Sequence, residues 1–189
     1  MRNRGKFRKE YAHNGVYIYT ENESLIVPKF WGLYEIEKPV GAAIIGGRNL
    51  LVALTGSEDS LTLLDSDKEL VSTKYEDIEE ALTDQNGVKT TADLAELGSP
   101  AALFCKEYKA GGFDWYLPTL ADFQLMYDNK KELDIALAIC GGNMIETDNW
   151  HWISTRRHDQ HHWFSHWSYG YHDLSYQDFH NRVRPVSKL

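Results

Sequence analysis

Apolar residues recur at helical spacing only in the middle of this 189-residue chain, and segments typical of β-strands lie on both sides of that region. The helical pattern covers two segments, 91–108 and 119–139, with Thr91 as the expected cap of the first. Each segment is soon followed by a pair of adjacent glycines, which favour helix ends. Gly98 and Pro100 interrupt the first segment and predict either two short helices or one kinked helix. The sequence therefore predicts an α+β fold, with two helices and small antiparallel sheets.

The remainder of the chain is predicted to be β structure and irregular segments. The expected strands cover residues 15–20, 25–27, 40–45, 50–54 and 113–117, the first four as two hairpins. Residues 55–88 are polar and acidic, which indicates a surface segment with a short helix near 75–82. Beyond Asn149 we expect short strands and exposed loops. An N-terminal β-hairpin region, residues 1–60, is predicted to pack on a main domain, residues 61–189.

Charge and hydropathy exclude several classes of partner. The net charge of −8 argues against nucleic acid. No apolar run reaches the roughly 18 residues of a membrane span, and no secretory signal is recognisable at the N-terminus. We therefore expect a protein made in the cytoplasm without membrane insertion, which is compatible with later display on a virion. Cys105 and Cys140 lack CxxC spacing and are predicted to be buried thiols rather than a disulfide.

The last forty residues have an unusual composition. Seven of the eight histidines and four of the six tryptophans lie between Trp150 and His180. The span 151–181 contains no Lys, Glu, Met, Ala or Val. A solvated face would be rich in Lys and Glu, and a core would be rich in aliphatic residues. Aromatic side chains interleaved with small polar residues are instead typical of a binding surface.

Two catalytic alternatives compete with a binding surface. His158, His161 and His162, with Asp159 nearby, have a spacing that suits zinc on a helix, but this segment lacks helical periodicity and has no HExxH pattern. Histidine-based nucleophilic catalysis needs a nucleophile beside its base, and no serine or cysteine here carries such a signature. We therefore predict a non-catalytic protein without metal or cofactor, and keep a histidine-rich metal-dependent enzyme as the alternative.

The chain resembles the variable proteins of diversity-generating retroelements, which occur in phages and bacteria, including gut Bacteroides. Four blocks carry the resemblance: Gly111-Gly112-Phe113-Asp114-Trp115-Tyr116-Leu117-Pro118-Thr119 followed by Asp128-Asn129-Lys130, then Cys140-Gly141-Gly142, then His151-Trp152-Ile153-Ser154-Thr155, and Arg182-Val183-Arg184-Pro185-Val186. The resemblance implies a C-type-lectin-like fold of the formylglycine-generating-enzyme type, with a loop-rich C-terminal binding face. Ile153 departs from the pattern, which has serine there. Cys105 and Cys140 do not reproduce the cysteine pair of the formylglycine-generating enzyme. The resemblance therefore does not imply that enzyme's activity for this chain.

In this family a reverse transcriptase mutates adenines, so diversified codons encode a restricted set of residues that excludes Trp and Gln. The resemblance therefore implies a fixed framework of Trp152, Trp163, Trp167 and Gly170, with a variable binding region at 151–181. The predicted ligand-contacting residues are Arg157, His158, Asp159, His161, Phe164, His166, Tyr169, Tyr171, Asp173, Ser175, Tyr176, Asp178 and Phe179, with His162, His172 and His180 as further candidates.

The resemblance also suggests the partner. The expected ligand is a protein or a glycan on a cell surface, bound by a chain that can form homo-oligomers or sit in many copies on a virion, where multivalency would raise the affinity. A similar fold also occurs in proteins that are not diversified. A fixed structural domain of a phage tail or fibre is therefore the other alternative.

Overall fold

The N-terminal hairpins and the last strand of the chain form one six-stranded antiparallel sheet, in the order β1-β3-β2-β4-β5-β11. The computed structural model describes residues 4–158 and 160–189. The strands are β1 (Lys6–Phe7), β2 (Gly15–Thr20), β3 (Leu25–Ile26), β4 (Pro39–Ile45), β5 (Leu50–Ala53) and β11 (Val186–Lys188). The two predicted hairpins are confirmed, and β11 pairs with β5, so both ends of the chain share one sheet.

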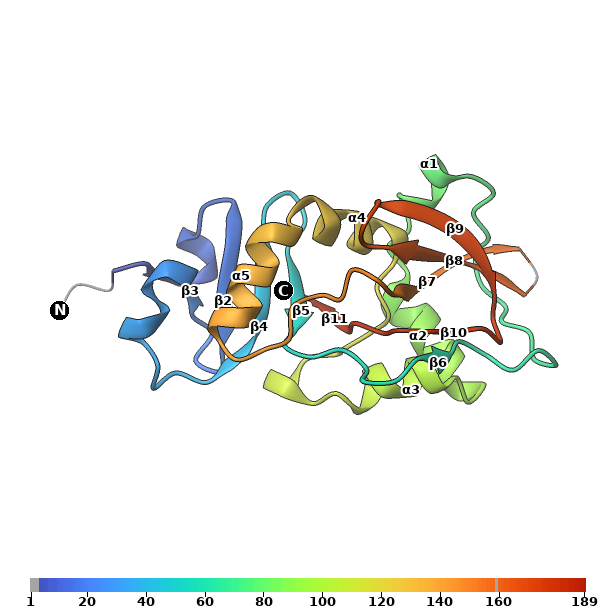
Figure 1. The fold of residues 1–189 in the computed structure, drawn as a ribbon, viewed down its shortest axis with the longest axis horizontal. Helices are drawn as coiled ribbons and strands as arrows, with labels where there is room; N and C mark the ends of the chain where they lie inside the picture. The colour runs from blue at the N-terminus through green and yellow to red at the C-terminus, as the bar shows by residue number, and fades with distance from the viewer. Residues whose placement is uncertain (1–3, 159) are drawn as a thin grey trace.

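Helix α5 (Lys130–Ile139) lies beside this sheet, together with the 3₁₀ helix η2 (Pro28–Leu33) (Figure 1). The buried residues of α5 include Leu133 and Leu137. They pack with Ile18, Ile44 and Val52 of the sheet in one apolar core. Burying aliphatic side chains on both elements removes apolar surface from water, which is the main source of folding free energy.

The two predicted helical segments are each divided into two helices. They are α2 (Gly87–Glu96) and α3 (Pro100–Glu107), then α4 (Leu120–Asp128) and α5. The predicted cap at Thr91 is wrong: α2 begins four residues earlier, and the Thr91 hydroxyl instead accepts a hydrogen bond from the Leu117 N–H (3.0 Å). Thr119 does cap α4, in a capping box with Asp122.

The connecting segments are mostly irregular, and the longest joins β6 (Leu61–Thr62) to α1 (Ile78–Ala81). They contain α1, within the predicted short helix, the 3₁₀ turns η1 (Lys9–Tyr11) and η3 (Ala110–Gly112), and the small sheet of β6 with β10 (His180–Asn181). The strand predicted at 113–117 is reduced to a single bridge between Tyr116 and Val186. Cys105 and Cys140 are buried free thiols, as predicted. Among the described residues, no helix is both long and apolar enough to cross a bilayer.

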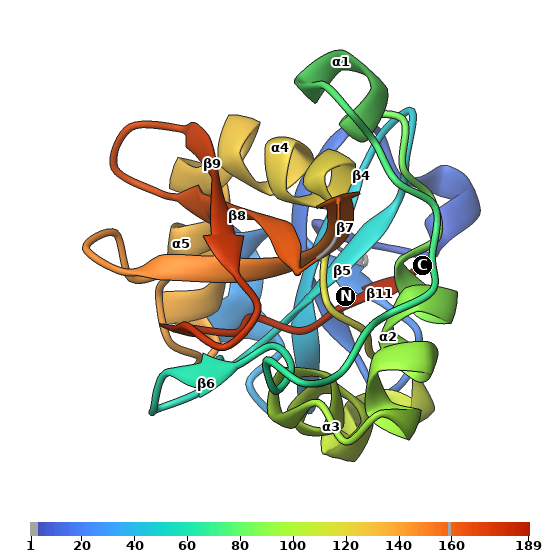
Figure 2. The same cartoon turned by 90° about the vertical axis from the view of Figure 1, so that its right-hand side faces the viewer.

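The C-terminal region forms a second antiparallel sheet of three strands, β7 (Trp150–His158), β8 (His161–His166) and β9 (Tyr171–Tyr176). It lies at the other end of the molecule from the N-terminus, and Figure 2 views the molecule from that end. The prediction of a loop-rich face is therefore wrong for most of this region, because its strands pair continuously along β8 and β9. Together the helices and small antiparallel sheets confirm the α+β class.

Candidate functional site

The tryptophans of the C-terminal sheet are buried and hold it against the rest of the protein. Trp152 is fully buried among leucines and donates its indole N–H to the Leu61 carbonyl oxygen (2.7 Å). Trp163 and Trp167 are buried in the same core as Phe123 of α4. These three tryptophan rings therefore stabilise the fold and are not available to contact a ligand.

Gly170 and Ile153 also serve this framework. Gly170 has a φ of +62°, and a Cβ there would lie 2.7 Å from the Tyr127 ring, so both conformation and space favour glycine. Ile153 is fully buried in the main core, which explains an apolar residue where the resemblance implied serine. The next residues of this block are polar and buried. Thr155 donates to Asp84 (2.8 Å) and accepts from the Leu120 N–H (2.9 Å), which fixes β7 to the start of α4.

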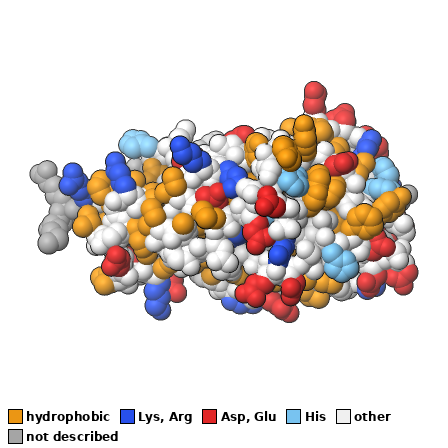
Figure 3. Space-filling model, viewed as in Figure 1, with side chains coloured by type: hydrophobic (Ala, Val, Ile, Leu, Met, Phe, Trp, Pro, Cys, Tyr) orange, Lys and Arg blue, Asp and Glu red, His pale blue; other side chains and the backbone are white. Residues whose placement is uncertain are grey.

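One face of the C-terminal sheet carries a continuous row of rings, which we call the aromatic row: Trp150, Phe164, His166, Tyr169 and Tyr171. Trp150 stacks on Phe164 with ring centroids 4.0 Å apart, and it also contacts His166. Tyr169 lies between His166 (5.5 Å) and Tyr171 (5.8 Å) and stacks on each, at interplanar angles of 23° and 26°. Tyr169 and Tyr171 are 69% and 67% exposed, so the row ends in open aromatic surface. Figure 3 shows histidine side chains beside apolar ones on the right-hand half of the molecule, where this sheet lies.

A second group of rings, the hairpin cluster, consists of His158, His161, Tyr176 and Phe179. It gathers where β7 turns into β8. The centroid distances are 4.5 Å from His158 to His161, 4.2 Å from His161 to Tyr176 and 5.9 Å from Tyr176 to Phe179. Tyr176 and Phe179 are more than half exposed. Eight of the thirteen predicted contact residues thus lie in these two groups.

The other predicted contact residues are placed less uniformly. Asp173 and Asp178 are exposed, and Arg157 is half-buried with its guanidinium over the Trp163 ring (5.7 Å). Ser175 is buried and does not reach the surface, and Asp159 lies outside the described residues. The aromatic row also contains a residue that sequence reasoning missed, Trp150. The structure shows why it belongs there, because Trp150 pairs with His166 in β8 and the two share a face, a register that the sequence alone does not reveal.

The three further histidines differ in their surroundings. His162 is fully buried, and burial, then the charges of Arg156 and His161, lower its pKa to about 3. His172 is half-buried, hydrogen-bonded to Ser165 (2.9 Å) and Gln124 (3.2 Å), and burial lowers its pKa. His180 is exposed on β10.

The proposed zinc spacing does not bring three histidines together. His158 and His161 pair across the hairpin, but His162 follows His161 directly in a strand and so points to the other face of the sheet. Across residues 4–158 and 160–189, no group of three or more His, Cys, Asp or Glu side chains is placed to hold a metal ion.

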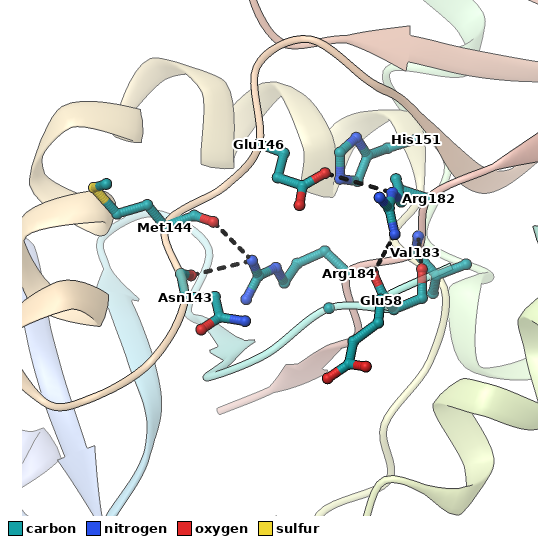
Figure 4. Close-up of a pocket in the computed structure, with 10 residues that line it drawn as sticks. Glu58, Asn143, Met144, Glu146, His151, Arg182, Val183 and Arg184 are labelled. Atoms are coloured by element: carbon teal, nitrogen blue, oxygen red, sulfur yellow. Dashed lines mark hydrogen bonds and ion pairs between the residues drawn. The ribbon is translucent and has the colours of Figure 1, made fainter. Parts of the chain in front are cut away.

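A polar cavity of about 180 Å³ lies beside β7 of the C-terminal sheet, where residues 182–184 meet the loop that precedes β7 (Figure 4). Arg184 forms its inner wall and donates to the carbonyl oxygens of Ala53, Leu54, Asn143 and Met144 at 3.0–3.2 Å. Burial lowers the pKa of Arg184 to about 10. Buried arginines are stable only when their donors are paired, so this residue ties the central sheet, the loop and the terminal segment together.

His151 and Arg182 form the other side of the cavity. The His151 ring is buried with Nδ1 3.1 Å from the Asn149 oxygen. Burial, with the charges of Arg184 and Arg182, lowers its pKa to about 3, so the ring is neutral at pH 7. Arg182 pairs with Glu146 (3.4 Å). The Ser57 hydroxyl accepts a hydrogen bond from the Val183 N–H. These contacts join chain segments and give the cavity a structural role.

Comparison with known proteins shows the fold but no family. No protein-family model matches the chain, and no curated protein does either. Among solved structures, the fold is similar to part of a fimbrial protein from Bacteroides ovatus, with a TM-score of 0.54 and 12% sequence identity. The similarity covers 74% of this chain and 35% of that protein, so this chain corresponds to only about a third of its length. The chain therefore shares its α+β fold with a domain-sized part of a Bacteroides fimbrial protein.

Proposed function

We propose that this protein is a non-catalytic ligand-binding protein whose C-terminal sheet presents a changeable recognition surface to a protein or glycan on a cell surface. The observation that carries the proposal is the division of rings in this sheet. Trp152, Trp163 and Trp167 are buried, whereas Tyr169, Tyr171, Tyr176 and Phe179 stand more than half exposed. Exposed aromatic groups of this size mark interaction sites more often than they serve stability.

The geometry suits binding because the displayed rings stand on strands and on the turns beside them. Phe164, His166 and Tyr171 lie on β8 and β9, whose pairing and buried tryptophans fix the backbone. Large, stiff aromatic side chains on a fixed backbone lose little conformational entropy on binding, and their rings supply most of the contact area. A surface of this kind can change its side chains without changing its fold.

Diversification by a retroelement is the source of that change in our proposal. It is supported by the coincidence of two independent properties, residue type and exposure. The exposed rings and carboxylates are of types that mutated adenine codons encode, and three tryptophans of the sheet, which such codons do not encode, are buried: Trp152, Trp163 and Trp167. We extend the proposal to a C-type-lectin-like fold, and to synthesis in the cytoplasm followed by display in many copies on a virion, where weak single contacts add up.

A fixed structural domain of a fibre is the second candidate. The similarity to a fimbrial protein favours it, because that protein shares this fold over 74% of the present chain. In that case the exposed rings would contact a neighbouring subunit of one fixed sequence.

A pair of displayed libraries tests the proposal. One randomises the displayed set: Phe164, His166, Tyr169, Tyr171, Asp173, Tyr176, Asp178 and Phe179. The matched library randomises an equal number of buried positions: Trp152, Ile153, His162, Trp163, Ser165, Trp167, Ser175 and Gln177. Both use the same restricted residue set. We expect most members of the first library to resist protease like the parent, because six of its eight positions are exposed and surface substitutions usually change stability by less than about 0.5 kcal/mol. The largest losses in this library are expected at Phe164, which is partly buried against the cluster that contains Trp152.

The second library should lose protease resistance almost completely. Selection of the first library against several unrelated purified proteins should enrich different sequences for each target. Equal loss of protease resistance in both libraries would show that the displayed residues are needed for folding. A first library that folds but yields no binder would favour the fixed fibre domain.

A further inference from the structure

Strand β9 is an open edge of the C-terminal sheet. The strand order is β7-β8-β9, and among the described residues β9 has a neighbouring strand on the β8 side only. The outer edge of β7 differs, because it forms bridges from His151 to Arg182 and from Lys74 to Arg156. Figures 1 and 2 show β9 at the periphery of this end of the molecule. An open edge carries main-chain N–H and C=O groups that another strand can pair with.

The hydrogen bonds identify which residues present these groups. The Gln177 N–H donates to the Gln160 oxygen across the hairpin (3.1 Å), so the odd-numbered residues of β9 point their main-chain groups toward β8. The Leu174 N–H donates instead to the side chain of Asp173 (2.8 Å). Alternation along an antiparallel strand therefore directs the main-chain groups of His172, Leu174 and Tyr176 outward. The Tyr176 oxygen already accepts hydrogen bonds from the Phe179 N–H (3.1 Å) and the Ser175 hydroxyl (3.3 Å), so at this residue the edge offers its N–H.

Side chains hold this edge in place and flank it. Leu174 packs against the main core, and His172 is hydrogen-bonded to Ser165 and Gln124, so the backbone is fixed by residues that point inward. Tyr171 and Tyr176, at the two ends of the strand, are 67% and 51% exposed. The edge thus combines a rigid row of main-chain donors and acceptors with an open aromatic ring at each end.

The Asp173 side chain covers the centre of the edge. Its carboxylate accepts a hydrogen bond from the Leu174 N–H, which is the middle of the three outward-pointing N–H groups of β9. Charged side chains on an edge strand oppose uncontrolled pairing between copies of the same protein. A partner strand that pairs with this edge can offer a main-chain carbonyl oxygen to the Leu174 N–H in place of the Asp173 carboxylate. The N–H then stays hydrogen-bonded when the carboxylate moves away.

We propose that β9 binds an extended segment of a protein ligand as an added β-strand. This inference rests on the proposed function and narrows its ligand class to polypeptide. The reason is complementarity: donors and acceptors that repeat every second residue match another strand, and the rings on either side offer contacts for its alternate side chains. The main-chain bonds would supply affinity for any extended segment. The displayed side chains would select the sequence.

The test uses a displayed library of random peptides of about a dozen residues, selected against the intact protein. Selected peptides are then resynthesised with single N-methyl groups, which remove one main-chain donor at a time. We expect methylation to weaken binding by about tenfold or more at every second position and by much less at the positions between. Binding that depends on peptide side chains without this two-residue period would overturn the strand pairing and leave the recognition surface intact.

A matched pair of variants tests the protein side. Leu174→Pro removes an outward N–H without removing a hydrogen bond to β8, and proline is tolerated on such edges. Leu174→Val is the control, because it also shortens the side chain but keeps the main-chain N–H. Circular dichroism first establishes that both variants are folded. The proline variant should then bind the selected peptides about tenfold or more weakly than the valine variant does. Equal affinities would contradict the inference, as would failure of the library to yield any peptide.

Discussion

Replacement of Trp152 by alanine is expected to lower the free energy of unfolding by about 3–5 kcal/mol. The ring is fully buried in a cluster with Leu63, Leu64 and Leu117, and its N–H is bonded to the Leu61 oxygen. Truncation therefore leaves a cavity and an unpaired carbonyl oxygen at once. Urea unfolding followed by far-UV circular dichroism measures the change.

Tyr171→Ala is the matched control, because it removes an aromatic ring from the same sheet at a position that is 67% exposed. Its effect should stay within about 0.5 kcal/mol. Similar losses for both variants would mean that the exposed rings also stabilise the fold. The separation between framework and displayed residues would then be wrong.

The protein should lose stability steeply in mild acid. His151 and His162 are neutral in the folded state with pKa values of about 3, compared with the ordinary value of 6.5. Between these values the unfolded chain binds protons that the folded chain excludes, so stability is full above pH 6.5 and falls as the pH is lowered toward 3. Each histidine should contribute a loss of about 1.4 kcal/mol per pH unit in that window. Urea unfolding at several pH values between about 7 and 4 measures the slope.

His162→Leu isolates one of these contributions. His162 is fully buried, and neither ring nitrogen has a hydrogen-bond partner among the residues that the structure describes, so an apolar residue of similar size loses none of the described bonds. The variant should be at least as stable as the parent at pH 7, and its stability should fall less steeply with pH, by about 1.4 kcal/mol per unit. A slope equal to that of the parent would show that His162 does not exclude its proton in the folded state.

The sequence predicted the fold best where one local pattern dominates. The hairpins of β2 to β5 follow from apolar runs separated by turns, and Thr119 marks the start of α4 because its hydroxyl and Asp122 satisfy the first free N–H groups of the helix. The start of α2 was misplaced because Thr91 resembles a cap in sequence. Its hydroxyl is used in a contact with Leu117, 26 residues away, which no local pattern reveals.

The candidate site was predictable as a set of residues but not as a surface. Composition separated the tail from the rest of the chain. It could not distinguish His162 and Ser175 from exposed neighbours of the same types. These two residues pair with each other beside Arg156, which is itself buried and donates to the main-chain oxygen of Leu70. Their burial thus depends on a segment distant in sequence.

The measurement that tests the central claim most directly is sequencing of the last part of this gene from many cells or virions of one population, with the DNA downstream. We predict substitutions concentrated at the displayed set, unchanged Trp152, Trp163 and Trp167, and a near-copy repeat that differs at adenines beside a reverse transcriptase gene. An invariant tail without such a repeat, or substitutions spread equally over buried and exposed positions, would contradict the account of a diversified recognition surface on a fixed framework.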